Sequence, residues 1–431
     1  MKHLKVLPLA AFVAASISAL PSFAESDVEA LEKRIQELES KIETGYIYDQ
    51  QPAVLTPEIK VPAGVVFSGY ARYGAHYQGN KDAATVGTHG ALNANATGRL
   101  GNEGNGGEFQ LAKAFQSDSG AIWDLVLMLD HWSDSSWASD GGVNVKKMYA
   151  GATNLFESQP DLYIWAGRDF HQRPQTGLND YFWMTHDGQG AGFYNLDLGG
   201  VKFDLGVVAE IDGDMVGETG RYSVTSKFHG IQLGDSASLS LFANYGFASE
   251  KTPDDSLTTY QLAGELSFAG QRLLARYSDN TTDSTLYSHM LQEGKEAMLV
   301  SFDGSQSLSD KAGIEYLAAY QSLKESGNES RVNYNVIVRP TYQWDEIHST
   351  WLEAGYSVVD YDDIDATNSS WKFTVSQNMA VGPETWSRPM LRFYATAGNA
   401  DNEYAGTNTV GDIVQTDLDT FTVGAMFEAW W

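Results

Sequence analysis

The sequence predicts an all-β protein, an antiparallel β-barrel that spans a membrane, and the prediction depends on the terminal strand, the recurring two-residue period and the composition. Apolar residues alternate with other residues to the very end of the chain. Successive side chains of a strand point to opposite faces, so this ending has one lipid-facing and one water-facing surface. An unpaired aromatic edge invites other chains to pair with it, and closure into a ring satisfies every backbone polar group within a bilayer. The residues on the apolar face are Phe421, Val423, Ala425, Phe427, Ala429 and Trp431.

The composition suits a large barrel. The 431 residues are 42% hydrophobic and include 42 glycines, 22 tyrosines and 11 tryptophans, as expected of many short alternating strands. There is no cysteine, which excludes a disulfide framework. Beyond the amino terminus, no stretch is long and apolar enough to predict a transmembrane helix.

Residues 1–24 have the pattern of a secretory signal peptide. Lys2 and Lys5 precede an apolar stretch, and Ser22-Phe23-Ala24 supplies small residues for cleavage. A short buried helix fits less well, because the charged, apolar and small-residue parts follow the order that export requires.

Residues 25–44 are predicted to form a short coiled-coil helix. Apolar residues recur there with a 3-4-3-4 spacing. A single amphipathic helix on the barrel rim is the alternative. Residues 45–64 contain Pro52, Pro57 and Pro62 and are predicted to be a semi-extended linker. The seam residues are Val28, Leu31, Ile35, Leu38 and Ile42.

Residues 65–431 are predicted to form the transmembrane barrel. In the first segment Val65, Phe67 and Tyr73 share one face, while Tyr70 and Arg72 share the other. Segments of similar length recur along the chain and are long enough to cross a bilayer as tilted strands. Periodicity alone allows roughly 16 to 18 strands.

The formal net charge of −28 makes nucleic acid an improbable partner. In a barrel this acidity would lie in the lumen and loops, where it could favour neutral or cationic solutes. It could equally serve only to keep the loops solvated.

Aromatic and basic residues with lumen parity, or near a predicted constriction, indicate a ligand. An aromatic ring in a wet lumen is costly unless a ligand covers it. Sugars present an apolar C–H face to aromatic rings and hydroxyl groups to charged side chains. The residues concerned are Tyr70, Phe182, Trp386, Tyr394, Trp430, Arg72, Arg173, Arg388 and Arg392.

Several motifs, in order and over essentially all of residues 65–431, resemble maltoporins and their carbohydrate-porin relatives, including sucrose and β-glucoside porins. The resemblance implies an 18-stranded trimeric outer-membrane barrel that passes sugars by passive, saturable diffusion. The resemblance also agrees with an amino-terminal coiled coil. The residue pattern of that coiled coil, taken alone, favours a dimer. The motifs are Tyr70-Ala-Arg72, Gly98-Arg-Leu-Gly-Asn-Glu103, Ile164-Trp-Ala-Gly-Arg-Asp-Phe-His-Gln-Arg173, Gly188-Gln-Gly-Ala-Gly192, Trp386-Ser-Arg-Pro389, Thr396-Ala-Gly-Asn-Ala-Asp401 and Trp430-Trp431.

The resemblance also implies site residues. An aromatic slide would include Tyr70, Trp386 and Trp430, with Trp137, or alternatively Trp132, reaching from an external loop into a neighbour's channel. Phe182 would stand at the constriction. The family's other slide rings and one carboxylate are replaced here by Glu108, Gln261 and Gln175, which should alter the choice of saccharide. The polar track would consist of Arg72, Arg99, Lys146, Arg173 and Asp180.

The implied partners are oligosaccharides, outer-membrane lipid and two further copies of the chain in a homotrimer; phages that attach to external loops are a further candidate. A general diffusion porin is the alternative function. An enzyme is not expected, because Ser288-His289 lacks an elbow motif and a third partner. No cofactor or metal is expected either, since the acidic run from Asp360 to Asp365 lacks the pattern of a calcium loop.

Overall fold

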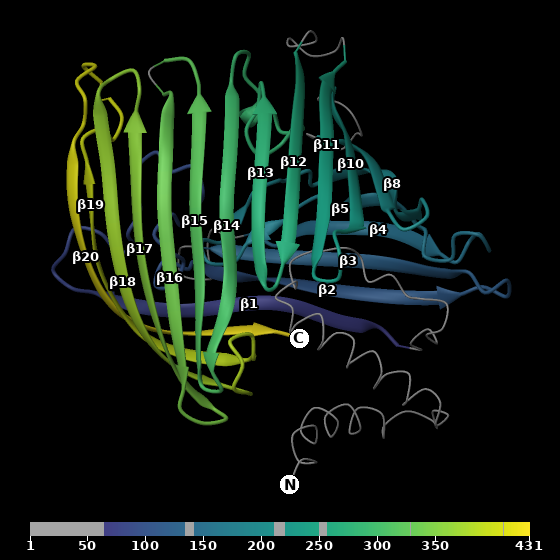
Figure 1. Cartoon of the computed structure of the whole chain (residues 1–431), viewed down its shortest axis with the longest axis horizontal. Helices are drawn as coiled ribbons and strands as arrows, with labels where there is room; N and C mark the ends of the chain where they lie inside the picture. The colour runs from purple at the N-terminus through teal and green to yellow at the C-terminus, as the bar shows by residue number, and fades with distance from the viewer. Residues whose placement is uncertain (1–63, 134–141, 211–219, 250–256, 328, 408) are drawn as a thin grey trace.

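The computed structural model shows one closed antiparallel barrel (Figure 1). It describes residues 64–133, 142–210, 220–249, 257–327, 329–407 and 409–431. The predicted signal peptide, the coiled-coil helix, nearly all of the linker and Trp137 lie outside these residues. The barrel strands are β1 (Val66–Gln78), β2 (Asn105–Gln116), β3 (Ile122–Ser133), β4 (Asn144–Thr153), β5 (Tyr163–Asp169), β8 (Gly188–Asp197), β9 (Lys202–Ala209), β10 (Arg221–Gln232), β11 (Ala237–Ala248), β12 (Thr258–Phe268), β13 (Gln271–Asp279), β14 (Glu296–Ser309), β15 (Ala312–Lys324), β16 (Arg331–Gln343), β17 (His348–Tyr361), β18 (Ala366–Ala380), β19 (Met390–Asn402) and β20 (Thr416–Trp430).

The sheet contains 18 strands, which confirms the predicted fold. Each strand pairs with its neighbours in the barrel, and β20 returns to pair with β1, from Tyr70↔Trp430 to Gln78↔Thr422. This closure leaves no open edge. A two-stranded hairpin of β6 (Gln175–Thr176) and β7 (Tyr181–Phe182) and a 3₁₀ turn, η1 (Ser288–Met290), lie in the connections.

The predicted alternation is visible in β18. Trp371 and Phe373 point outward and are 48% and 42% exposed, whereas Lys372 and Thr374 point inward and are buried. The outward residues meet lipid in a membrane, so an exposed apolar exterior is what the bilayer requires. Trp431 lies on this exterior and packs against Phe67, with the ring centroids 5.4 Å apart.

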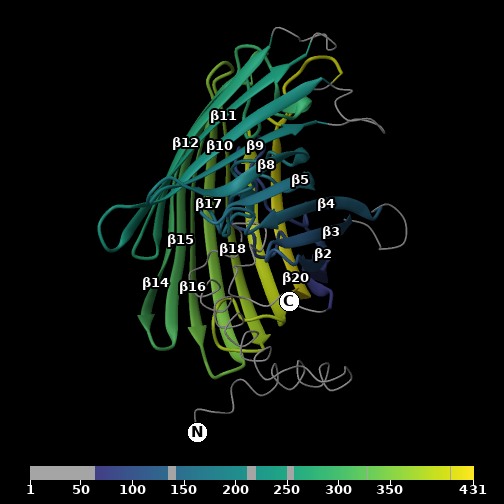
Figure 2. The ribbon, with the colours of Figure 1, turned by 90° about the vertical axis from the view of Figure 1, so that its right-hand side faces the viewer.

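The two ends of the barrel differ in the length of their connections. One end has tight turns such as Ala269 and Gly270, whose φ angles of 47° and 75° are both positive, as a two-residue type I′ hairpin requires. The other end has the long connections 79–104, 170–187 and 280–295. Figure 2 shows the tilted wall from a second side. Among the described residues, no helix has the length and apolar character to cross a membrane.

Candidate functional site

Two of the long connections fold into the lumen and pack against the inner face of the barrel wall. Leu100, in the connection between β1 and β2, is fully buried in a cluster with Trp351 and Met390. Leu178, between β5 and β8, packs against Leu317 and Ile337. Apolar residues in otherwise polar connections explain this inward course, because burial removes them from water. The inward segments narrow the lumen.

Polar contacts hold the first inward segment in place. The ammonium group of Lys372 donates hydrogen bonds to the carbonyl oxygens of Gly98 and Leu100, the latter at 2.7 Å. The Leu100 amide donates to Glu353 at 2.9 Å. A buried cation and carboxylate thereby satisfy backbone groups that have left the strand ladder.

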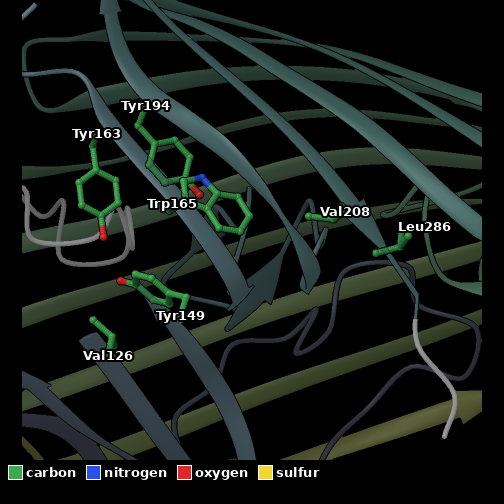
Figure 3. Close-up of a cluster of buried hydrophobic side chains, with 7 residues drawn as sticks. All are labelled: Val126, Tyr149, Tyr163, Trp165, Tyr194, Val208 and Leu286. Atoms are coloured by element: carbon green, nitrogen blue, oxygen red, sulfur yellow. The ribbon is translucent and has the colours of Figure 1, made fainter. Parts of the chain in front are cut away.

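A cluster of buried side chains, rich in aromatic rings, is drawn in Figure 3. His171, at the start of the second inward segment, contacts this cluster, with 5.5 Å between its ring centroid and that of Trp165. The rings of Trp165 and Tyr194 are 5.8 Å apart and nearly parallel, and Tyr163 lies on the other side of Tyr194 at 6.2 Å. His171 bonds the Tyr194 hydroxyl at 2.8 Å, and burial lowers the pKa of His171 to about 4, so the ring is neutral at pH 7. All three rings are buried, so they support the segment and are not available to a solute.

A second set of rings is only partly buried and lines the lumen where the barrel closes. Tyr70 on β1 lies 6.4 Å from Trp430 on β20, and the ring planes differ by 23°. On its other side Tyr70 lies 6.4 Å from Trp132 of β3, with 30° between the planes. The guanidinium of Arg388 covers Trp430, with 4.3 Å from Cζ to the ring centroid.

Glu428, on β20, is the centre of a buried charge cluster beside these rings. Its side chain is fully buried. It accepts hydrogen bonds from Arg99 at 2.9 Å, from Arg392 at 2.9 Å and from Arg388 Nε at 2.9 Å. The Tyr70 hydroxyl donates to the same carboxylate at 2.9 Å. One carboxylate therefore fixes three cations and one ring of the lumen wall.

Charged residues continue along the lumen beside the rings. Arg72 pairs with Asp180 of the second inward segment at 2.9 Å. Arg173 lies 3.9 Å from Glu108 and 3.5 Å from Asp187. Burial raises the pKa of Asp187 to about 6, although the neighbouring guanidinium favours the charged form.

The remaining described residues of the predicted site are Phe182, Lys146 and Trp386. The guanidinium of Arg173 covers Phe182, with 4.2 Å from Cζ to the ring centroid. Lys146 pairs with Asp130 at 3.3 Å. Trp386 lies in the turn between β18 and β19, is half-buried and is two residues from Arg388.

The structure thus brings Tyr70, Trp430, Arg72 and Asp180 together and links Arg99 to them through Glu428. Glu428 was not among the site residues predicted from the sequence. Of the three acidic residues of β20, Asp417, Asp419 and Glu428, only Glu428 has lumen parity, and this was the available signal. Its partners Arg388 and Arg392 come from β19 and the turn before it, and Arg99 comes from the connection between β1 and β2. The place of Trp132 beside Tyr70 was also missed, since it was considered only for a neighbour's channel.

A family model described as LamB porin matches residues 65–431. The chain is 29% identical over 417 residues to a maltoporin of Vibrio cholerae serotype O1, and the alignment covers 85% of this chain and 95% of that protein. Among solved structures, OmpT of Vibrio cholerae is similar at 12% identity, with a TM-score of 0.41 and coverage of 85% of this chain and 99% of its own. An anion-selective porin from Comamonas acidovorans is similar at 13% identity, with a TM-score of 0.40 and coverage of 85% and 99%. The match over the whole barrel shows that the chain belongs to the LamB porin family.

Proposed function

We propose that this porin is selective for sugars and passes oligosaccharides across the outer membrane by passive, saturable diffusion. The observation that carries the proposal is the near-parallel pair of Tyr70 and Trp430 on the lumen wall, with a carboxylate and guanidinium groups beside it. A pyranose ring can place its C–H face on such rings while its hydroxyl groups bond the flanking charges. The name of the Vibrio cholerae relative, a maltoporin, supports a saccharide as the solute.

In this proposal Trp386 continues the aromatic slide at the end of the barrel with the tight turns. Phe182 stands at the constriction, and the polar track is formed by Arg72, Arg99, Lys146, Arg173 and Asp180. Several weak stacking contacts in series, each worth about 0.5–1.5 kcal/mol beyond area burial, would bind a sugar without trapping it, as conduction requires.

Two further parts of the proposal concern targeting and assembly. Residues 1–24 direct export and are cleaved, and three copies of the mature chain form the trimer, with the predicted helix of residues 25–44 held together by the barrels through high effective concentration. Mass spectrometry of the mature amino terminus and of the native oligomer tests both parts. An uncleaved terminus contradicts the first, and a monomer or dimer contradicts the second.

Titration of channels in planar bilayers tests the transport function. We expect maltose, sucrose, a β-glucoside or longer dextrins to block the ion current in a saturable way at millimolar concentrations or below. A general diffusion porin would conduct without saturation. Absence of block by every saccharide would therefore favour that alternative.

A further inference from the structure

Gly106 of β2 lies between two residues of the candidate site. In the strand register it is the partner of Arg72 on β1 and of Trp132 on β3. A Cβ atom at Gly106 would lie 2.2 Å from Cε3 and 2.4 Å from Cδ2 of the Trp132 ring. The indole therefore rests directly on the bare backbone of β2, and a larger residue at this position would displace it.

In this position the indole of Trp132 lies over β2 and reaches the rings of Tyr70 and Trp430, where β1 pairs with β20. Trp132 is 6.4 Å from Tyr70, and Tyr70 is 6.4 Å from Trp430, so the three rings form a file over β3, β1 and β20. Trp132 shares its face of the sheet with Arg72 through the register at Gly106, so its half-buried ring is on the lumen side of the wall. Trp132 is the penultimate residue of β3, at the end of the barrel that carries the long connections. Tyr70 and Trp430 lie near the other ends of their strands, so Trp132 is the outermost ring of this file.

Arg72 holds two rings of the file, Trp132 and Tyr70, in place. Its guanidinium carbon is 5.2 Å from the Trp132 centroid and 5.9 Å from the Tyr70 centroid. The same side chain is held by Asp180 at 2.9 Å and by the carbonyl oxygen of Gly104 at 2.9 Å. A cation held in this way over two rings restrains both of them, so the file is formed before a solute arrives.

The residue directly beside Tyr70 on β2 is Glu108. It supplies a carboxylate, not a stacking face, and its ion pair with Arg173 is loose at 3.9 Å. Among the residues that the structure describes, Trp132 is the ring that stacks beside Tyr70 on this side. The indole supplies a ring there, and Glu108, two residues along β2 from Gly106 on the same face, supplies a carboxylate as a hydrogen-bond acceptor.

We infer that Trp132, seated on Gly106, forms the outer sugar subsite of its own channel, where a pyranose stacks on the indole and donates hydroxyl hydrogen bonds to Glu108. This inference rests on the proposed function and goes beyond it in assigning a subsite. It predicts that sugar affinity depends on a ring of β3 and on a glycine of β2.

The test is sugar block of purified channels in planar bilayers, with maltotriose and sucrose titrated in parallel. Trp132→Ala should weaken the binding of a blocking sugar about two- to tenfold, the range expected for loss of one stacking contact. Trp132→Phe should recover part of the affinity. Gly106→Ala keeps the indole but displaces it, and should weaken binding as Trp132→Ala does.

Trp123→Ala is the matched control, because this residue lies on the same strand but points outward and is 47% exposed. It should leave the affinity unchanged. The variant Tyr70→Ala distinguishes a failure of the Trp132 subsite from a failure of the proposed function. If Tyr70→Ala weakens block and Trp132→Ala does not, the subsite is refuted while the proposed function stands; if neither sugar blocks the wild-type channel, the inference falls together with the function.

Discussion

Replacing Glu428 by glutamine tests the charge cluster beside the rings. The side chain is fully buried and is the shared acceptor of three guanidinium groups and the Tyr70 hydroxyl. Glutamine keeps the shape but removes the charge, so Arg99 and Arg388 lose their carboxylate partner and Arg392 retains only Glu103. Uncompensated buried charge of this kind costs about 3–5 kcal/mol.

The assay is equilibrium unfolding of the purified barrel in detergent micelles by guanidinium chloride, followed by tryptophan fluorescence. We expect the free energy of unfolding of Glu428→Gln to fall by the amount given above. The matched control is Glu296→Gln. This variant removes the carboxylate of a 2.7 Å ion pair in which the side chain of Glu296 is 41% exposed and that of Lys324 is 69% exposed. Exposed pairs contribute little, so the control should unfold as the wild type does.

A loss of less than about 1 kcal/mol for Glu428→Gln, the range typical of exposed pairs, would refute the reasoning. It would mean that water reaches the three guanidinium groups readily. The cluster would then have no special role in fixing Tyr70 and Trp430.

Three further predictions concern conduction and selectivity. Trp386→Ala should weaken sugar-induced current noise and leave ion conductance similar or higher; equal sugar affinity in the two proteins would remove this residue from the slide. Leu100→Ala creates a cavity in a fully buried cluster, at a cost of about 2–5 kcal/mol. It should loosen the inward segment and raise single-channel conductance; unchanged conductance would show that the hydrogen bonds to Lys372 and Glu353 retain the segment without the Leu100 side chain. Burial raises the pKa of Asp187 to about 6, so the folded protein binds this proton more tightly than the unfolded chain does. The cost of the buried charge is therefore full above pH 6 and declines as the pH falls from 6 towards the ordinary pKa of 3.8. Cation selectivity, measured as zero-current potential in a salt gradient, should therefore decrease around pH 6, and Asp187→Asn should abolish that step; a step that persists in the variant would assign it to another group.

Much of the fold could be predicted because the environment of a membrane barrel acts on every second residue. Lipid on one side and water on the other impose opposite demands on Phe427 and Glu428, and this contrast is local in the sequence. The number of strands is not local. Period-two segments did not distinguish 16 from 18 strands, and it was the resemblance to carbohydrate porins that implied the correct number.

The candidate site also has one part that the sequence predicts and another part that depends on distant segments of the chain. The parity of Tyr70 and Trp430 follows from their own strands, and the structure places both rings in the lumen. The position of Trp132 depends on a missing side chain at Gly106 of another strand, and the partners of Glu428 include Arg99 of an inward segment. Contacts of this kind depend on the closed barrel and leave no periodic signal in the sequence.

The pairing of β1 with β20 joins the two ends of the folded chain and also creates the ring pair, since Tyr70 and Trp430 are direct partners across this seam. A barrel that has inserted every other strand but has not zipped this last one has no Tyr70–Trp430 contact and lacks the Tyr70 bond to Glu428. Under the proposed function, stacking of a sugar on this ring pair therefore requires the sealed barrel, and strand pairing at the seam and assembly of this part of the site are one event.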